Sequence, residues 1–156
     1  MKVLIKPITK KNVKEAINIA VAATVGERPE VEKDMFKNLT EKTNRYFAAY
    51  CGQEMVGEIG WYQDKEGFAK KALGDIFPEG EDVFWVAYFS IKPSFRSKGI
   101  GRILMKKIET EVKNNGCRKL WVYTLRARVF YEKCGFKFVQ QGFIEDCWQN
   151  FLKKSF

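Results

Sequence analysis

The chain has 156 residues, with 28 Lys and Arg against 19 Asp and Glu and no His, and this length fits a single domain over residues 1–156. The lack of His excludes catalysis by Ser-His or Cys-His pairs and most catalytic zinc sites, so we expect no metal. No segment is apolar enough to span a membrane or to act as a signal peptide, which favours a cytoplasmic protein with no membrane partner.

The spacing of apolar residues predicts strands and helices along the whole chain. In chain order, the expected elements are strand 3–8, helices 13–21 and 29–39, strands 46–51, 55–62 and 83–91, helix 99–114, strand 120–124, helix 126–134, and strands 136–143 and 147–152. Residues 63–82 are polar and contain several Gly and Pro, which predicts a long loop that is functional or mobile and has room for one helical turn. We therefore expect an α/β (α+β) domain.

The excess of cations, +9 in formal charge, is scattered along the chain. A basic protein can bind nucleic acid, an anionic membrane or a polyanionic ligand, but scattered cations are typical of a solvated surface. We therefore expect no nucleic-acid partner. The four cysteines are widely spaced and include no C-x-x-C pair, so we expect free thiols.

One segment carries a candidate ligand site, the turn between an apolar strand and the helix that begins at Gly99. A helix start has backbone N–H groups without partners and a partial positive charge, which together bind anions. Gly99 and Gly101 keep side chains out of this turn. Positive charge around it comes from Arg96, Lys98 and Arg102. The pattern predicts a site for a diphosphate or polyphosphate, although it is neither a P-loop nor a dinucleotide fingerprint.

These residues resemble the N-acetyltransferases of the GNAT family. Residues 96–101 read R-S-K-G-I-G and match the family signature [RQ]-x-x-G-x-[GA], and residues 127–136 match A-x-x-F-Y-x-x-x-G-F. One expected helix and one expected strand separate the two motifs, as in the family. The resemblance implies a mixed, mostly antiparallel central sheet of about seven strands, splayed at its middle and flanked by about four helices.

The resemblance also implies acetyl-CoA as co-substrate. In the family, backbone groups of the central strand pair with the pantetheine amides, and the N–H groups of the loop hold the pyrophosphate. The implied cofactor-binding set is Phe89, Ser90, Ile91, Arg96, Ser97, Lys98, Gly99, Ile100, Gly101, Arg102, Thr124 and Ala127. Thr124 departs from the Asn that the family often has, and its side chain reaches less far.

The acid and base of the reaction are the next expectation. Tyr131 takes the position of the family's tyrosine, which protonates the leaving thiolate, and a pKa of about 10 keeps a tyrosine protonated at neutral pH. Some members carry a Glu base in the central strand, where this chain has Trp85. An alkylammonium with a pKa of about 10.4 must lose a proton before it can attack. Glu58 is the first candidate for that base; Glu81, Asp82 and an ordered water chain are the alternatives.

The leading function is N-acetylation of a small-molecule amine by direct attack on the thioester, in a monomer or a homodimer. The alternatives are acetylation of a protein N-terminus or lysine, a non-catalytic acyl-CoA sensor, and a basic nucleic-acid binder. The net charge weakly favours a neutral or acidic acceptor. Five aromatic residues could hold a cationic amine or belong to the core: Trp61, Tyr62, Trp85, Tyr88 and Tyr123.

Overall fold

The structure, a computed structural model, describes residues 1–23, 27–41, 44–77 and 83–156. The chain forms two compact units: unit 1 comprises Met1–Tyr62 and Val86–Thr110, and unit 2 comprises Gln63–Trp85 and Glu111–Phe156. The expected single domain over residues 1–156 stays a prediction. Two of the candidate bases, Glu81 and Asp82, lie outside the described residues.

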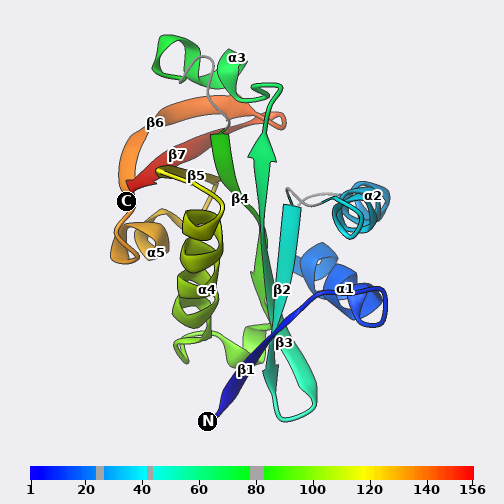
Figure 1. Cartoon of the computed structure of the whole chain (residues 1–156). Helices are drawn as coiled ribbons and strands as arrows, with labels where there is room; N and C mark the ends of the chain where they lie inside the picture. Colours follow the sequence, from blue (N-terminus) through cyan, green and yellow to red (C-terminus); the bar gives the residue numbers. More distant parts are fainter. Residues whose placement is uncertain (24–26, 42–43, 78–82) are drawn as a thin grey trace. The chain divides into compact units, whose positions relative to one another are not determined.

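Unit 1 contains the N-terminal elements (Figure 1). These are β1 (Val3–Pro7), α1 (Val13–Ala23), α2 (Arg28–Asn38), β2 (Asn44–Cys51), most of β3 (Glu54–Asp64), most of β4 (Val83–Ile91), the short 3₁₀ helix η2 (Pro93–Phe95) and most of α4 (Ile100–Asn114). Both β1 and β3 pair antiparallel with β2. In the register of β2 and β3, Ala48 lies opposite Glu58. Figure 1 shows α1 and α2 side by side.

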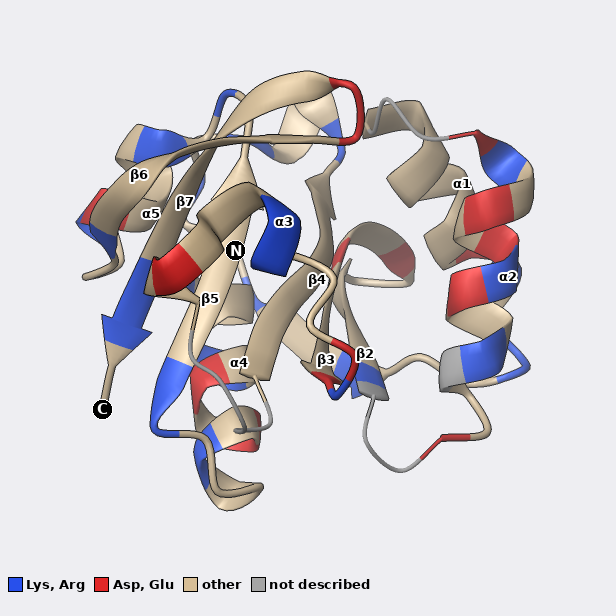
Figure 2. Cartoon of the chain, turned by 90° about the horizontal axis from the view of Figure 1, so that it is seen from above, with Lys and Arg blue, Asp and Glu red and all other residues tan. Residues whose placement is uncertain are grey.

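The core of unit 1 follows from the periodicity of α1. Val13, Ala16, Ile17 and Ala20 share one helical face, and all four are buried. This face belongs to an apolar cluster completed by residues of α2, β2 and β3: Val31, Met35, Tyr46, Ala48, Tyr50 and Met55. Burying each large apolar side chain stabilises the fold by about 1.5–3 kcal/mol. Acidic and basic residues alternate over the surface of α2 (Figure 2).

Unit 2 contains the C-terminal elements. These are α3 (Lys70–Leu73), the short 3₁₀ helix η1 (Gly74–Ile76), β5 (Lys119–Thr124), α5 (Arg128–Lys133), β6 (Lys137–Ile144) and β7 (Cys147–Ser155). β7 pairs antiparallel with both β5 and β6. The β6–β7 turn consists of Glu145 and Asp146, both with positive φ, and Figure 2 shows it in red.

The predicted loop over residues 63–82 is partly structured in its described part, 63–77. Asp64 fixes the start of this segment, because its carboxylate accepts hydrogen bonds from the backbone N–H groups of Glu66 and Gly67 (2.9 and 3.0 Å) and of Phe68 (3.0 Å). The short α3 follows and packs against β6, where a Cβ on Gly142 would lie 2.9 Å from the Ala72 carbonyl oxygen.

The strands form a seven-stranded sheet in the order β1-β2-β3-β4-β5-β7-β6. Among the described residues, β4 and β5 are parallel neighbours, and their register contains two pairs, Phe84 with Leu120 and Trp85 with Trp121. This mixed, mostly antiparallel topology confirms the predicted fold class. Among the described residues five α-helices form rather than about four, because α3 arises in the segment expected to be a loop. None of the described helices is long and apolar enough to cross a membrane.

Candidate active site

The predicted anion site is the loop between β4 and α4 in unit 1. Ser97 and Gly99 both have left-handed backbones, with φ of 60° and 82°. Left-handed residues in such turns create concave groups of N–H donors that bind anions. The helix begins directly afterwards, and the Arg102 and Ile103 N–H groups both donate to the Gly99 carbonyl (3.1 and 3.2 Å). A non-glycine residue with positive φ is uncommon, so Ser97 marks a specifically shaped turn.

This loop offers open space and positive charge for an anion. A Cβ on Gly99 would meet no protein atom within 4 Å, so the space beside the turn is open to a ligand. Lys98 lies over the ring of Phe95, with Nζ 5.2 Å from the ring centroid, which keeps its charge at the loop. Arg102 is exposed on the first turn of α4.

Arg96 has a role that the motif does not reveal. Its Nε donates a hydrogen bond to the Ile91 carbonyl at the end of β4 (3.0 Å). The side chain therefore ties the loop to the strand that precedes it. Arg96 also lines a cavity of about 300 Å³ together with Ile91, Pro93 and the C-terminal half of α1.

The central strand β4 changes its environment along its length. Val83–Val86 are buried, whereas Ala87, Tyr88 and Phe89 are half-buried. Ser90 is buried again, at 4% exposure, and its hydroxyl has no hydrogen-bond partner among the described residues. The sequence had assigned Ser90 only a backbone role, but an unpartnered buried hydroxyl indicates that its side chain also matters.

Glu58 on β3 is the most unusual titratable residue that the structure describes. It is fully buried, and neither carboxylate oxygen has a hydrogen-bond partner among the described residues. Burial raises the pKa of Glu58 from 4.5 to about 8, and the nearby Ser90 hydroxyl offsets part of that rise. Residues with such strongly shifted pKa values are enriched in active sites.

Close packing of the sheet around Glu58 explains this burial. A Cβ on the preceding residue, Gly57, would lie 2.8 Å from the Ser90 carbonyl oxygen, so β3 and β4 approach closely there. On the neighbouring strand, Ala48 lies opposite Glu58 and is fully buried. The structure thus brings Glu58 and Ser90 together in unit 1.

Tyr131 lies on α5 in unit 2 and is 5% exposed. Its ring makes edge contacts with Phe130 and Phe136, at centroid distances of 5.4 and 5.5 Å. The helix ends just beyond it, where Gly135 takes a left-handed backbone (φ 90°). The A-x-x-F-Y-x-x-x-G-F motif is therefore a short helix, its glycine stop and an aromatic cluster around the tyrosine.

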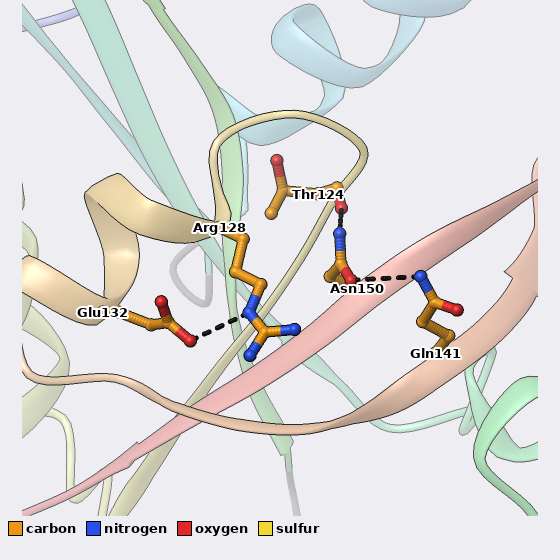
Figure 3. Close-up of polar contacts among 5 residues, drawn as sticks. All are labelled: Thr124, Arg128, Glu132, Gln141 and Asn150. Atoms are coloured by element: carbon orange, nitrogen blue, oxygen red, sulfur yellow. Dashed lines mark hydrogen bonds and ion pairs between the residues drawn. The ribbon is translucent and has the colours of Figure 1, made fainter.

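Thr124 and Ala127 lie in the turn that leads into α5. The Thr124 hydroxyl accepts a hydrogen bond from the Ala127 N–H (3.0 Å) and so closes the turn. Asn150 on β7 donates from Nδ2 to the Thr124 carbonyl (3.3 Å) and accepts from Gln141 (3.4 Å), as Figure 3 shows. In the same view, Arg128 and Glu132 pair along α5 (2.8 Å). The sequence motifs gave no indication of Asn150.

The aromatic residues that were expected near the acceptor divide into two groups. Trp61 and Trp85 are fully buried, whereas Tyr62, Tyr88 and Tyr123 are half-buried. In unit 2, Trp85 packs against Phe68 and Tyr123, with ring centroids 4.9 and 5.9 Å apart. The tryptophans are therefore core residues, and the tyrosines have surface available for a ligand.

The comparisons with known proteins agree with this architecture. The model of the acetyltransferase (GNAT) family matches residues 13–136, most of the chain, so the protein belongs to this family and is an acetyltransferase by fold and family. The family uses acetyl-CoA as acyl donor. The comparison with curated proteins finds no match. Among the described residues, no group of His, Cys, Asp and Glu could hold a metal ion.

Several solved structures share the fold. A protein described as a GNAT-family acetyltransferase from Desulfovibrio desulfuricans has a TM-score of 0.78 at 15% identity, with 99% of both chains covered. The aminoglycoside antibiotic 6′-N-acetyltransferase AAC(6′)-Ig from Acinetobacter haemolyticus has a TM-score of 0.67 at 16% identity, covering 84% of this chain and 86% of that chain. AAC(6′)-Iy in complex with the bisubstrate analogue CoA-S-monomethyl-acetylneamine has a TM-score of 0.69 at 16% identity, covering 86% and 87%.

Proposed function

We propose that this protein transfers an acetyl group from acetyl-CoA to a primary amine of a small molecule, with Glu58 as general base and Tyr131 as general acid. The observation that carries the proposal is the Glu58 carboxylate, fully buried and without a hydrogen-bond partner among the described residues. A buried ionised group without partners is costly, and an arriving ammonium group would supply the missing donors.

The position of Glu58 supports this assignment. It lies beside Ser90 on β4, and β4 leads within a few residues into the loop proposed to hold the CoA pyrophosphate. Two proteins with the same fold are linked to small amines. The Acinetobacter protein is named as an aminoglycoside 6′-N-acetyltransferase, and AAC(6′)-Iy was solved with a CoA analogue joined to acetylneamine. Both favour a small-molecule acceptor over a protein.

The proton balance of the reaction follows from the two side chains. Acetyl-CoA, when bound, supplies a thioester carbonyl as the electrophile. The acceptor nitrogen must lose two protons: one passes through Glu58 to solvent, and the other replaces the proton that Tyr131 gives to the departing sulfur. With a pKa of about 8, about a tenth of Glu58 is ionised at pH 7, so the base functions best in mildly alkaline solution.

The experiment is an acetyl-transfer assay with a panel of small amines and basic peptides, in which release of the CoA thiol is followed. The protein has four free cysteines of its own, so a blank without acetyl-CoA sets the baseline. We expect transfer to small amines and a rise in Tm with acetyl-CoA, since a ligand of the folded state stabilises it.

Three outcomes separate the alternatives. Transfer to peptides in preference to every small amine would establish a protein acetyltransferase. A Tm rise without thiol release for any amine would establish a sensor. No Tm rise with acetyl-CoA would contradict the cofactor site as well as the reaction.

A further inference from the structure

A second carboxylate lies close to the sheet on the side of unit 1 where α2 packs. Asp34 on α2 is exposed, and its Oδ2 accepts a hydrogen bond from the Tyr88 hydroxyl (2.9 Å). Tyr88 belongs to β4, two residues before Ser90. The hydrogen bond therefore fixes an exposed carboxylate above the strand that carries the buried Ser90 hydroxyl.

An aromatic pair lies next to Asp34. The rings of Tyr46 and Tyr88 stack with their centroids 6.3 Å apart and an interplanar angle of 28°. Gly60 makes room for this arrangement, because a Cβ there would overlap the ring of Tyr46. Tyr46 is buried in the core, whereas Tyr88 is half-buried. Aromatic rings attract cations placed over their faces, so Tyr88 is the ring that a positively charged ligand can contact.

The strand positions next to the two carboxyl groups are separated by about one strand repeat. Tyr88 and Ser90 are two residues apart on β4 and point to the same face of the sheet, as do Glu58 and Gly60 on β3. Two residues of a strand span about 7 Å. Ser90 lies beside Glu58, so Tyr88, whose hydroxyl binds Asp34, is one such step along β4 from the residue beside the proposed base.

We propose that the acceptor carries a second positive group besides the amine that reacts, and that Asp34 binds it. The reacting amine goes to Glu58, and the chain between the two groups lies along the half-buried ring of Tyr88. A carboxylate accepts hydrogen bonds at both oxygens, so the bond from Tyr88 leaves Asp34 able to accept more. The inference rests on the proposed function, because Glu58 defines where the reacting amine binds.

This inference opposes the expectation from net charge. The chain is basic as a whole, which weakly favoured a neutral or acidic acceptor. The proposed acceptor site contains two carboxyl groups, one buried at Glu58 and one exposed at Asp34. Recognition of the second positive group depends on the local charge at Asp34, because exposed charges farther away than about 10 Å are largely screened by salt.

The test compares two amines of equal carbon chain, butylamine and 1,4-diaminobutane, with acetyl-CoA as donor. For the unmodified protein we expect kcat/KM to be about fivefold higher for the diamine, the size of effect that one partly exposed ion pair provides. Asp34→Asn should bring this ratio close to one by raising KM for the diamine. Tyr88→Phe should lower the ratio too, since it removes the hydroxyl that orients Asp34.

The matched control is Glu30→Gln, which removes an exposed carboxylate one turn earlier on the same helix. It should leave the ratio at its original value. A ratio near one in the unmodified protein, or a preference for the diamine that survives Asp34→Asn, would overturn the inference while the acetyltransferase proposal stands. A complete lack of transfer to any amine would overturn both.

Discussion

Glu58 in unit 1 and Tyr131 in unit 2 are both buried polar side chains, but their surroundings differ. Tyr131 lies among aromatic rings, in edge contact with Phe130 and Phe136. Glu58 has a carboxylate whose oxygens find no hydrogen-bond partner among the described residues. An aromatic environment suits a neutral phenol, whereas the site of Glu58 is stable only when that group is protonated or a donor arrives.

The two side chains are kept neutral in different ways. A phenol is neutral at pH 7 because its pKa is about 10. Glu58 is kept neutral by burial, which raises its pKa to about 8. In the proposed mechanism, substrate binding has to change the protonation state of Glu58, whereas Tyr131 reacts in the form that it already has.

Replacing the base should give the largest effect. We expect Glu58→Gln to lower kcat/KM by about 10²–10⁴-fold, the contribution of a positioned general base. In the unmodified protein, log kcat/KM should rise with pH and level off near pH 8, where Glu58 becomes ionised. A pH profile of kcat/KM checks both, and the same rise in the variant would show that another group is the base.

Replacing the acid should give a smaller effect. Tyr131→Phe keeps the aromatic packing and removes only the hydroxyl, so we expect kcat to fall by about 10²-fold, at the low end for acid catalysis, because a thiolate is already a fair leaving group. Steady-state kinetics with acetyl-CoA measure this, and Phe130→Leu on the same helix serves as a packing control. Full activity of Tyr131→Phe would remove the acid from the mechanism.

The free energy of unfolding should also depend on pH because Glu58 is buried. The folded state binds the Glu58 proton more tightly than the unfolded state, so the free energy of unfolding should fall as pH rises from 4.5 to about 8, by at most about 1.4 kcal/mol per pH unit. Urea unfolding across this range, with Glu58→Gln alongside, measures the slope. The variant should show a flatter profile, and an equal slope in both proteins would contradict the buried pKa.

The smallest effect is expected in the turn before α5. Thr124→Val removes the hydroxyl that accepts from the Ala127 N–H, and one such hydrogen bond contributes about 1 kcal/mol to stability. We expect a lowered Tm and a modest rise in KM for acetyl-CoA. Thr124→Ser, which keeps the hydroxyl, is the matched control and should stay close to the original values. Identical behaviour of Val and Ser would show that the hydroxyl has no part in holding the turn.

The sequence predicted well where local patterns decide the structure. The apolar spacing of α4, the glycine that stops α5 and the apolar runs of β2 and β3 depend on nearby residues only, and the fold class followed from their order. The long loop over residues 63–82 was predicted less well, since the order in its described part depends on the Asp64 carboxylate, which binds N–H groups that precede α3, and on the packing of α3 against β6. The cofactor-binding set and both catalytic assignments stay predictions.

Several of the contacts missed at sequence level join distant parts of the chain. Asp34 meets Tyr88 across more than fifty residues (|i−j| of 54), and Asn150 reaches the Thr124 carbonyl across 26. No spacing rule connects such pairs. One signal was available: Glu58 and Ser90 are polar residues inside otherwise apolar strands, and a polar residue in such a position needs a reason.

The division of the chain into two discontinuous units has a practical consequence. Each unit is built from two separate segments, and both β4 and α4 start in one unit and end in the other. A single cut in the backbone therefore cannot release either unit whole, and no simple truncation yields a fragment with a complete set of its own elements. Attempts to exchange one unit with a relative would have to be designed with three junctions rather than one.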